Sequence, residues 1–138
     1  MTLTLKNDIR EVSRLGDFLK AAAERYHLED AQGKELRLAV EEAVVNVIDY
    51  AYPEGEEGEI TLELNFEEGG VLIRVIDSGI PFDPTKTEEP DTSLPARERH
   101  IGGLGIYLLR SLTDSIRYER REGKNILILV KRFIHSLA

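Results

Sequence analysis

The stretch ELRLAVEEAVVNVIDYAY, residues 35–52, decides the fold because it reads as one long amphipathic helix. At about 100° per residue its apolar side chains fall on one broad side, as a core-facing helix requires. These side chains are Leu36, Val40, Ala43, Val44, Val47, Ile48 and Ala51. A narrow polar strip lies opposite and comprises Glu35, Glu42, Asn46 and Asp49. The pattern predicts a mostly buried helix that presents one acidic and amide-bearing strip to a cavity.

Two members of this strip suggest chemistry. Glu42 and Asn46 are four residues apart, so their side chains lie one turn apart on the same helix face. A carboxylate and an amide so placed can activate a hydroxyl and hold a hydrated divalent ion. The strip alone is equally compatible with an ordinary solvated face.

Composition limits the class of protein. The chain has 138 residues, enough for one domain with its own core, and it is 41% hydrophobic and 32% charged. Its net charge of −8 argues against nucleic acid or an anionic membrane as the main partner. It has no cysteine, so a thiol nucleophile is excluded. The amino terminus lacks an apolar signal region, and no apolar run approaches the roughly 20 residues of a membrane span, so we expect a cytoplasmic protein.

The rest of the chain alternates between helical and strand periodicity. Strands are predicted over residues 2–6, 60–66, 71–77, 115–121 and 125–133, and further helices over about 9–22 and 104–113. Asp30 is a plausible cap for the long helix, and Pro53 ends it. This order predicts an α+β fold, a two-layer sandwich in which helices cover one face of a mostly antiparallel mixed sheet.

Two segments suggest a ligand site. DSGIPFDP, residues 77–84, follows a predicted strand, so Asp77 could accept a hydrogen bond from the exocyclic amine of adenine while Gly79 lets a flat ligand approach. Asp-Ser-Gly is also ordinary turn chemistry. GGLG, residues 102–105, opens the last helix and could direct backbone amides at an anion, although such clusters are often flexible connections. Residues 78–101 between them hold four of the five prolines and are predicted to be a functional lid.

In combination these segments resemble the GHKL, or Bergerat-fold, ATP-binding family, and more closely the small anti-sigma factor serine kinases of bacteria. EEAVVNVIDYAY resembles the N box, DSGIPFDP the first glycine box and GGLGIYLLRSLTD the second. The resemblance runs from about residue 36 to residue 133. It implies a single ATP-binding domain over residues 1–138, with 78–101 as the ATP lid.

The resemblance also implies a role for each matching residue. Glu42 would be the catalytic base, Asn46 would coordinate Mg²⁺, and Asp77 would bind the adenine amine. The other residues implied in nucleotide binding are Asp49, Tyr50, Gly79, Phe82, Gly102, Gly103, Leu104 and Gly105. Phe82 could equally be a core residue.

Three features depart from the family pattern. Tyr50 stands where close relatives often carry histidine, and the last strand, NILILVKRF, lacks a threonine often found near adenine. A basic residue often stands just before the second glycine box, whereas here Ile101 directly precedes the glycines. The basic candidates nearby are Arg97, Arg99 and His100.

The implied function is an ATP-dependent serine/threonine protein kinase and anti-sigma regulatory factor. It would phosphorylate an anti-sigma-antagonist protein, sequester a sigma factor and form a homodimer, with the strand at residues 2–6 as one possible contact. The alternative is an ATP-gated binding switch that transfers no phosphate. A sensor histidine kinase fits less well, because the chain has no room for the helical hairpin that carries the acceptor histidine.

Overall fold

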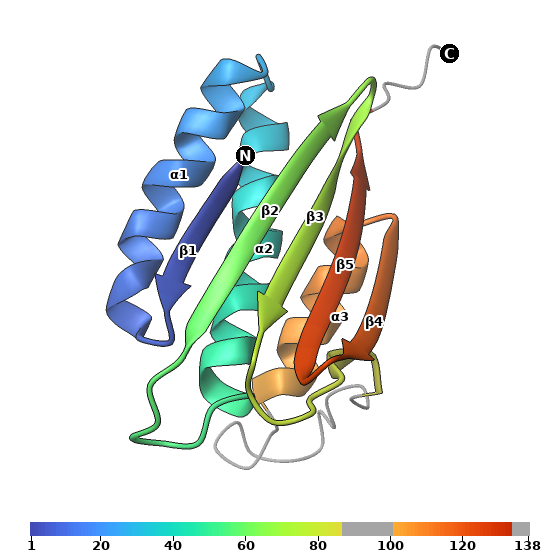
Figure 1. Cartoon of the computed structure of the whole chain (residues 1–138). Coiled ribbons are helices and arrows are strands. Elements are labelled where there is room, and N and C mark those ends of the chain that lie inside the picture. Colours follow the sequence, from blue (N-terminus) through green and yellow to red (C-terminus); the bar gives the residue numbers. More distant parts are fainter. Residues whose placement is uncertain (87–100, 134–138) are drawn as a thin grey trace.

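The computed structural model describes residues 1–86 and 101–133, and only the backbone of residues 101–105. Within these ranges five strands form one sheet, and three α-helices cover one of its faces (Figure 1). The strands are β1 (Thr2–Lys6), β2 (Glu59–Glu67), β3 (Gly70–Asp77), β4 (Ser115–Arg121) and β5 (Lys124–Arg132). The helices are α1 (Val12–Arg25), α2 (Asp30–Tyr50) and α3 (Ile101–Leu112), with 3-10 turns η1 (Ile9–Glu11) and η2 (Pro84–Lys86). The predicted two-layer α+β fold is confirmed.

The strand order in the sheet is β1-β2-β3-β5-β4, and each of the four pairings between described strands is antiparallel. The parallel pairing that a mixed sheet would need is therefore not seen among these strands. Both predicted hairpins are present. In the β4–β5 hairpin, Glu122 and Gly123 have φ values of 51° and 77°. Such a two-residue turn matches the twist of the strands that it joins.

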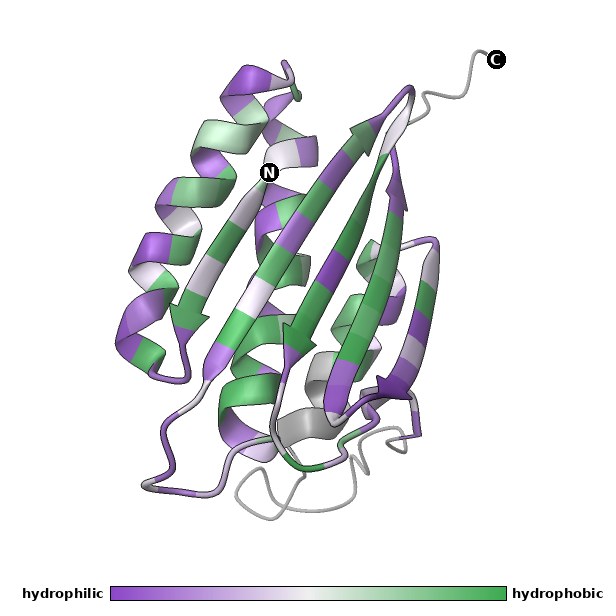
Figure 2. Ribbon diagram, in the orientation of Figure 1, coloured by the Kyte–Doolittle hydropathy of each residue, from purple (hydrophilic) through white to green (hydrophobic). Residues whose placement is uncertain are grey.

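The core lies between the sheet and the helices. Strands β2 and β3 alternate buried and partly exposed residues, so that one face of each packs on the helices. Strand β5 differs, since its centre is apolar on both faces (Figure 2). It lies inside the sheet, between β3 and β4. The side chains at the centre of the core are at most 1% exposed and include Leu36, Val40, Ile60, Leu62, Ile73 and Leu129.

Helix α2 begins differently from the prediction. Its N-cap is Glu29, not Asp30, because Glu29 has an extended backbone and forms a capping box with Gln32. The Gln32 Oε1 atom accepts a 3.0 Å hydrogen bond from the Glu29 amide. Asp30 is the first helical residue. The helix ends at Tyr50, since Pro53 cannot continue it and disfavours helical backbone just before itself.

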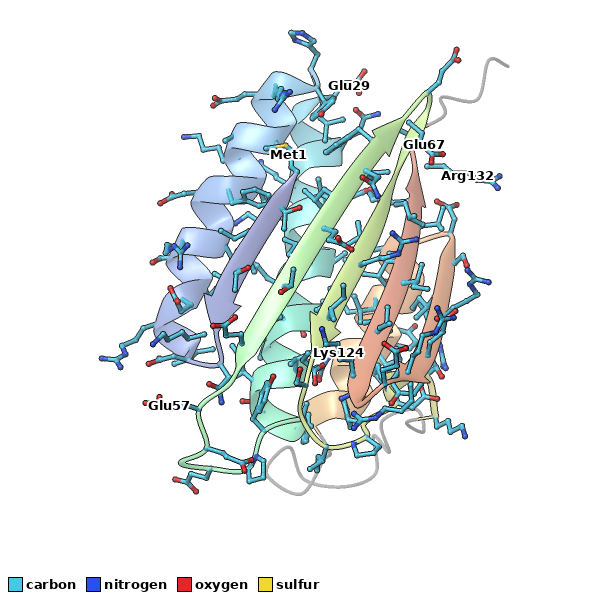
Figure 3. All side chains as sticks on the ribbon, in the orientation of Figure 1. Met1, Glu29, Glu57, Glu67, Lys124 and Arg132 are labelled. Carbon is cyan, nitrogen blue, oxygen red and sulfur yellow. The ribbon has the colours of Figure 1, made fainter. Side chains whose placement is uncertain are left out.

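The candidate site lies at one of the two ends of the sheet. Glu67 and Arg132 mark one end, and Lys124 marks the other (Figure 3). Asp77, the last residue of β3, pairs with Asn125 at the Lys124 end, where the candidate site lies. Within residues 1–86 and 101–133, no helix combines the length and hydropathy that crossing a lipid bilayer requires.

Candidate functional site

Asp77 is a buried carboxylate that faces the helix layer. It follows Ile73 and Val75 at alternate positions of β3, so its side chain points into the same core, and it is 3% exposed. Its Oδ1 atom accepts hydrogen bonds from the Gly79 amide at 2.8 Å and from Asn125 Nδ2 at 2.9 Å. Burial raises the pKa of Asp77, and the donors on Asn125 and Gly79 partly offset this effect. The site thus contains an acceptor aimed at the core side of the sheet.

Asn125 is the partner that sequence reasoning missed. It is 4% exposed and lies opposite Asp77 in the register of β3 and β5. Its Nδ2 also donates to the Ile80 carbonyl at 2.7 Å. Its Oδ1 accepts from three donors, which are the Tyr118 hydroxyl, the Arg120 guanidinium and the Phe82 amide. The signal in the sequence was a polar residue directly before the apolar run at residues 126–130 of β5, on the face that buries Leu127 and Leu129.

Gly79 has a packing reason to lack a side chain. A Cβ atom on it would lie 2.2 Å from the carbonyl oxygen of Ala51, the C-cap residue that follows α2. The next amide, that of Ile80, donates to the same oxygen at 2.7 Å. The loop after β3 is therefore held directly against the end of α2, which brings two of the predicted boxes into contact.

Tyr52 strengthens this junction and was not predicted as a site residue. Its side chain is buried, its hydroxyl donates to the Glu59 carbonyl at 2.7 Å, and it accepts from the Ser78 amide at 2.9 Å. Gly58 packs on its ring, since a Cβ on that glycine would lie 2.2 Å from a ring carbon. One phenol thus joins the end of α2, the start of β2 and the loop after β3.

Asn46 and Glu42 lie one turn apart on α2, as predicted. Asn46 is 5% exposed, and its buried Nδ2 has no hydrogen-bond partner among the described residues. An orphaned buried amide is costly, so a group that pairs with it on binding is favoured. Glu42 is partly buried, and burial, followed by the charge of Glu41, raises its pKa. A phosphate-bearing ligand would supply the missing acceptor.

The polar strip of α2 does not face a single cavity. Glu35 lies near the opposite end of the sheet, where its Oε2 atom accepts from the buried Lys131 ammonium at 2.8 Å. Asp49 is exposed and lines a different hollow of about 750 Å³, formed by residues 6–9, 48–49 and 52–57. The residues of this strip lie at similar angles around one helix. They contact different neighbours because different segments of the chain lie beside the helix at different points along its length.

Tyr50 and Phe82 meet across the junction. Their rings stack with centroids 5.2 Å apart and planes inclined by 23°. Phe82 also packs against the hydrophobic core, and its backbone amide donates to Asn125 Oδ1 at 3.3 Å. The two aromatic residues named in the predicted site are thus brought together.

Helix α3 begins at Ile101, three residues before the predicted start, so Gly102, Gly103 and Leu104 lie in its first turn. The first four amides of an α-helix have no carbonyl partner within it, which suits anion binding. Gly105 follows in the same helix.

Part of the predicted lid is structured. Asp83 Oδ1 accepts from the Thr85 amide at 2.9 Å at the start of η2, and Arg110 of α3 donates to the Thr85 carbonyl at 2.8 Å. The rest of the lid, residues 87–100, lies outside the described residues, together with the basic candidates Arg97, Arg99 and His100.

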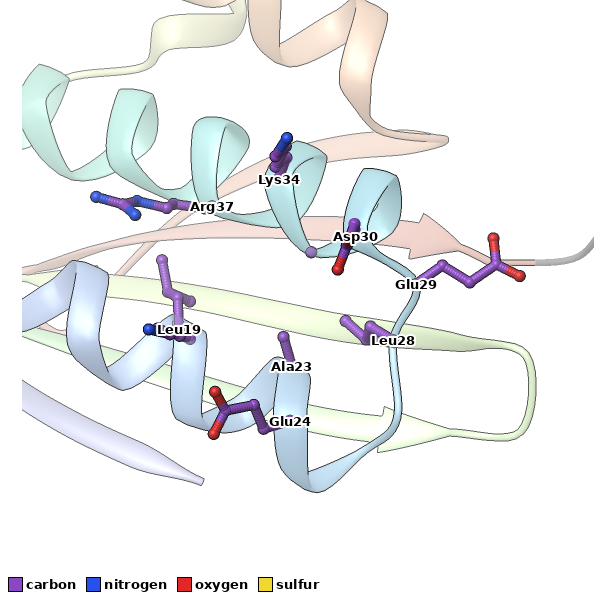
Figure 4. A pocket seen from close by; sticks show the side chains of 10 residues that line it. Leu19, Ala23, Glu24, Leu28, Glu29, Asp30, Lys34 and Arg37 are labelled. Carbon is purple, nitrogen blue, oxygen red and sulfur yellow. The ribbon is translucent and has the colours of Figure 1, made fainter.

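A separate hollow of about 300 Å³ lies between α1 and α2 (Figure 4). Leu19, Ala23 and Leu28 form its apolar part, and charged residues such as Lys34 and Asp30 line it as well. None of the predicted nucleotide residues lines it. It is therefore distinct from the candidate site.

Comparison with curated proteins finds serine-protein kinases RsbW. One from Listeria monocytogenes is 34% identical over 99 residues, which is 69% of this chain and 63% of that protein. One from Halalkalibacterium halodurans is 31% identical over 138 residues, covering 97% of this chain and 82% of the other. One from Oceanobacillus iheyensis is 27% identical, covering 97% and 85%. The chain thus spans about 63% of the length of the Listeria relatives and more than four fifths of the other two.

A solved structure and a family model agree with this result. The crystal structure of the RsbU and RsbW domains of Rv1364c from Mycobacterium tuberculosis matches with a TM-score of 0.69 and 17% identity, over 96% of this chain and 31% of that one. This likeness shows the fold. The model of the histidine kinase-like ATPase domain matches residues 5–131. Because this match covers most of the chain, the chain belongs to the histidine kinase-like ATPase domain family.

Proposed function

We propose that this protein is an ATP-dependent serine/threonine protein kinase and anti-sigma regulatory factor that acts in the cytoplasm. Its substrate would be an anti-sigma-antagonist protein, and its second partner a sigma factor. The observation that carries the proposal is the pair on α2. Glu42 is a partly buried carboxylate with a raised pKa, one turn from a buried Asn46 amide that lacks a partner. Binding of ATP alone requires no such base.

Each end of the nucleotide would meet a different element. Asp77 would accept a hydrogen bond from the adenine amine. The amides in the first turn of α3, including those of Gly102 and Gly103, would face the phosphates. Tyr50, Phe82 and Asp49 remain proposed nucleotide contacts, with Asp49 the least supported because it lines another hollow. Glu42 would take the proton from the substrate hydroxyl as that oxygen attacks the γ-phosphorus. The new bond joins the substrate oxygen to the γ-phosphoryl group, the bond to the bridging β,γ-oxygen breaks, and ADP leaves.

Mg²⁺ fits this site through Asn46. Among the described residues no three His, Cys, Asp or Glu side chains come together as a metal-binding group. Mg²⁺ commonly uses only one or two protein oxygens and completes its shell with phosphates and water. Asn46 Oδ1 would be that ligand. When bound, the ion supplies charge neutralisation at the phosphates.

The alternative is an ATP-gated switch that binds a regulator without phosphoryl transfer. We also propose a homodimer, with β1 as one contact, since β1 forms an edge of the sheet and its outer side pairs with no other described strand. Sedimentation that finds only monomer at micromolar concentration would reject the dimer.

The first test is calorimetric titration of ATP and Mg²⁺ into the wild type, Asn46→Ala and Asp77→Asn. We expect the wild type to bind and both variants to bind at least tenfold more weakly, because each loses a hydrogen bond to a charged or buried group. Absence of binding by the wild type would overturn the proposal.

The second test separates the kinase from the switch. The protein is incubated with ATP labelled at the γ-phosphate and a purified anti-sigma-antagonist protein from the same organism. Label on a serine or threonine of that protein supports the kinase. Nucleotide-dependent binding without label supports the switch.

A further inference from the structure

Five hydrogen bonds converge on the side-chain amide of Asn125. Two are donated by Nδ2, to Asp77 Oδ1 and to the Ile80 carbonyl. Three are accepted by Oδ1, from the Tyr118 hydroxyl, from Arg120 at 3.1 Å and from the Phe82 amide at 3.3 Å. The residue is 4% exposed, so these bonds stand in for the hydrogen bonds that water makes to an exposed amide. A buried amide with this many partners holds its neighbours in one arrangement.

The neighbours also fix which way the amide points. The guanidinium of Arg120 has only donors, so it must face the oxygen of Asn125. The ionised carboxylate of Asp77 has only acceptors, so it must face the nitrogen. A flipped amide would oppose donor to donor at Arg120 and acceptor to acceptor at Asp77. The donors of Arg120 and the acceptors of Asp77 therefore require the same orientation of the Asn125 amide that the structure shows.

This arrangement determines what Asp77 can bind. Asn125 and the Gly79 amide both bond Oδ1, and among the described residues no donor is bonded to Oδ2. The carboxylate thus keeps one free acceptor. Adenine presents a donor amine at the position where guanine presents a carbonyl oxygen, which an acceptor repels. Leaving a buried polar group opposite the wrong base costs far more than losing a methyl contact.

We propose that Asn125 is a positioning residue that makes the site select adenine over guanine nucleotides, by holding Asp77 with its free oxygen turned to the base. Tyr118 and Arg120 keep the Asn125 amide in place. This inference rests on the proposed function, and it assigns base selection to β4 and β5 as well as to β3.

The test measures ATP and GTP binding with Mg²⁺ by calorimetry in the full chain. The variants are Asn125→Leu, which removes the amide at similar size, Asn125→Thr, which restores one donor, and Tyr118→Phe. Asn65→Leu is the matched control, since Asn65 is exposed on β2. We expect the ratio of ATP to GTP affinity to fall about tenfold in Asn125→Leu, to recover partly in Asn125→Thr, and to stay unchanged in the control.

A purely structural role for Asn125 would weaken both nucleotides equally, so an unchanged ratio in Asn125→Leu would overturn the inference alone. Failure of the wild type to bind ATP would overturn the proposed function and this inference with it. If Asn125→Leu does not fold, Tyr118→Phe decides. It removes one hydroxyl, and an ATP to GTP ratio equal to that of the wild type would reject the proposed network.

Discussion

Gly79 lies so close to the end of α2 that a Cβ atom on it would be 2.2 Å from the carbonyl oxygen of Ala51. The contact joins two segments that are far apart in sequence. One carries the Glu42 and Asn46 pair, and the other carries Asp77. Their relative position is therefore set by backbone contact, reinforced by the Ile80 amide on the same oxygen at 2.7 Å.

Gly79→Ala should destabilise the fold by about 1–3 kcal/mol, because the methyl group cannot be accommodated without moving backbone. Urea denaturation monitored by circular dichroism measures this. Gly33→Ala is the control, since its Cβ would meet only the Ala23 Cβ at an ordinary 3.4 Å. Because Gly33 lies within a helix, Gly33→Ala should increase the free energy of unfolding by roughly 0.5–1 kcal/mol. Equal effects of the two substitutions would contradict the contact.

Tyr52→Phe should cost about 1–3 kcal/mol of folding free energy, since it leaves the Ser78 amide and the Glu59 carbonyl without their common partner. Tyr107→Phe provides the comparison, because Tyr107 is 58% exposed. Chemical denaturation of both variants checks this. A loss in Tyr52→Phe no larger than in Tyr107→Phe would show that the bridge contributes nothing.

Asp77→Asn should increase stability at neutral pH while it weakens ATP binding. Burial raises the pKa of Asp77 above its ordinary 3.8, so the folded state holds this proton more tightly than the unfolded state. The wild type consequently loses stability as pH rises from about that value through the raised pKa, whereas the neutral asparagine does not. Chemical denaturation at pH 4 and at pH 7 gives the free energies of unfolding of the wild type and of Asp77→Asn, and the difference between them is compared at the two pH values. A stability advantage of the variant that shrinks toward pH 7 would contradict the assignment.

Glu42→Gln should abolish phosphoryl transfer and leave ATP binding within about threefold of the wild type, since the amide cannot accept the hydroxyl proton. In the wild type the rate should rise with pH through the raised pKa of Glu42, above its ordinary 4.5, because only the carboxylate acts as base. Single-turnover transfer measured across pH tests both statements. A variant that transfers phosphate at the wild-type rate would remove Glu42 from the mechanism.

Local patterns predicted the elements well. Strand β1 and strand β4 match their predicted bounds, and the other three strands differ by one residue at their ends. The cap of α2 was misplaced by one residue, because Glu29 and Asp30 both suit that position and only backbone conformation distinguishes them. The start of α3 was misplaced because glycines at residues 102 and 103 disfavour helix in isolation.

The sequence by itself determined the periodicity, the order of elements and the one-turn spacing of Glu42 and Asn46, since these depend on neighbours along the chain. The tertiary structure alone decided which polar residues meet. Asn125 reaches Asp77 only because β5 pairs with β3, and Lys131 reaches Glu35 only because the two layers pack together. Asp49 lines another hollow although it shares a strip with Asn46. Helical periodicity fixes the angle of a side chain, whereas the packing of distant segments fixes its partner.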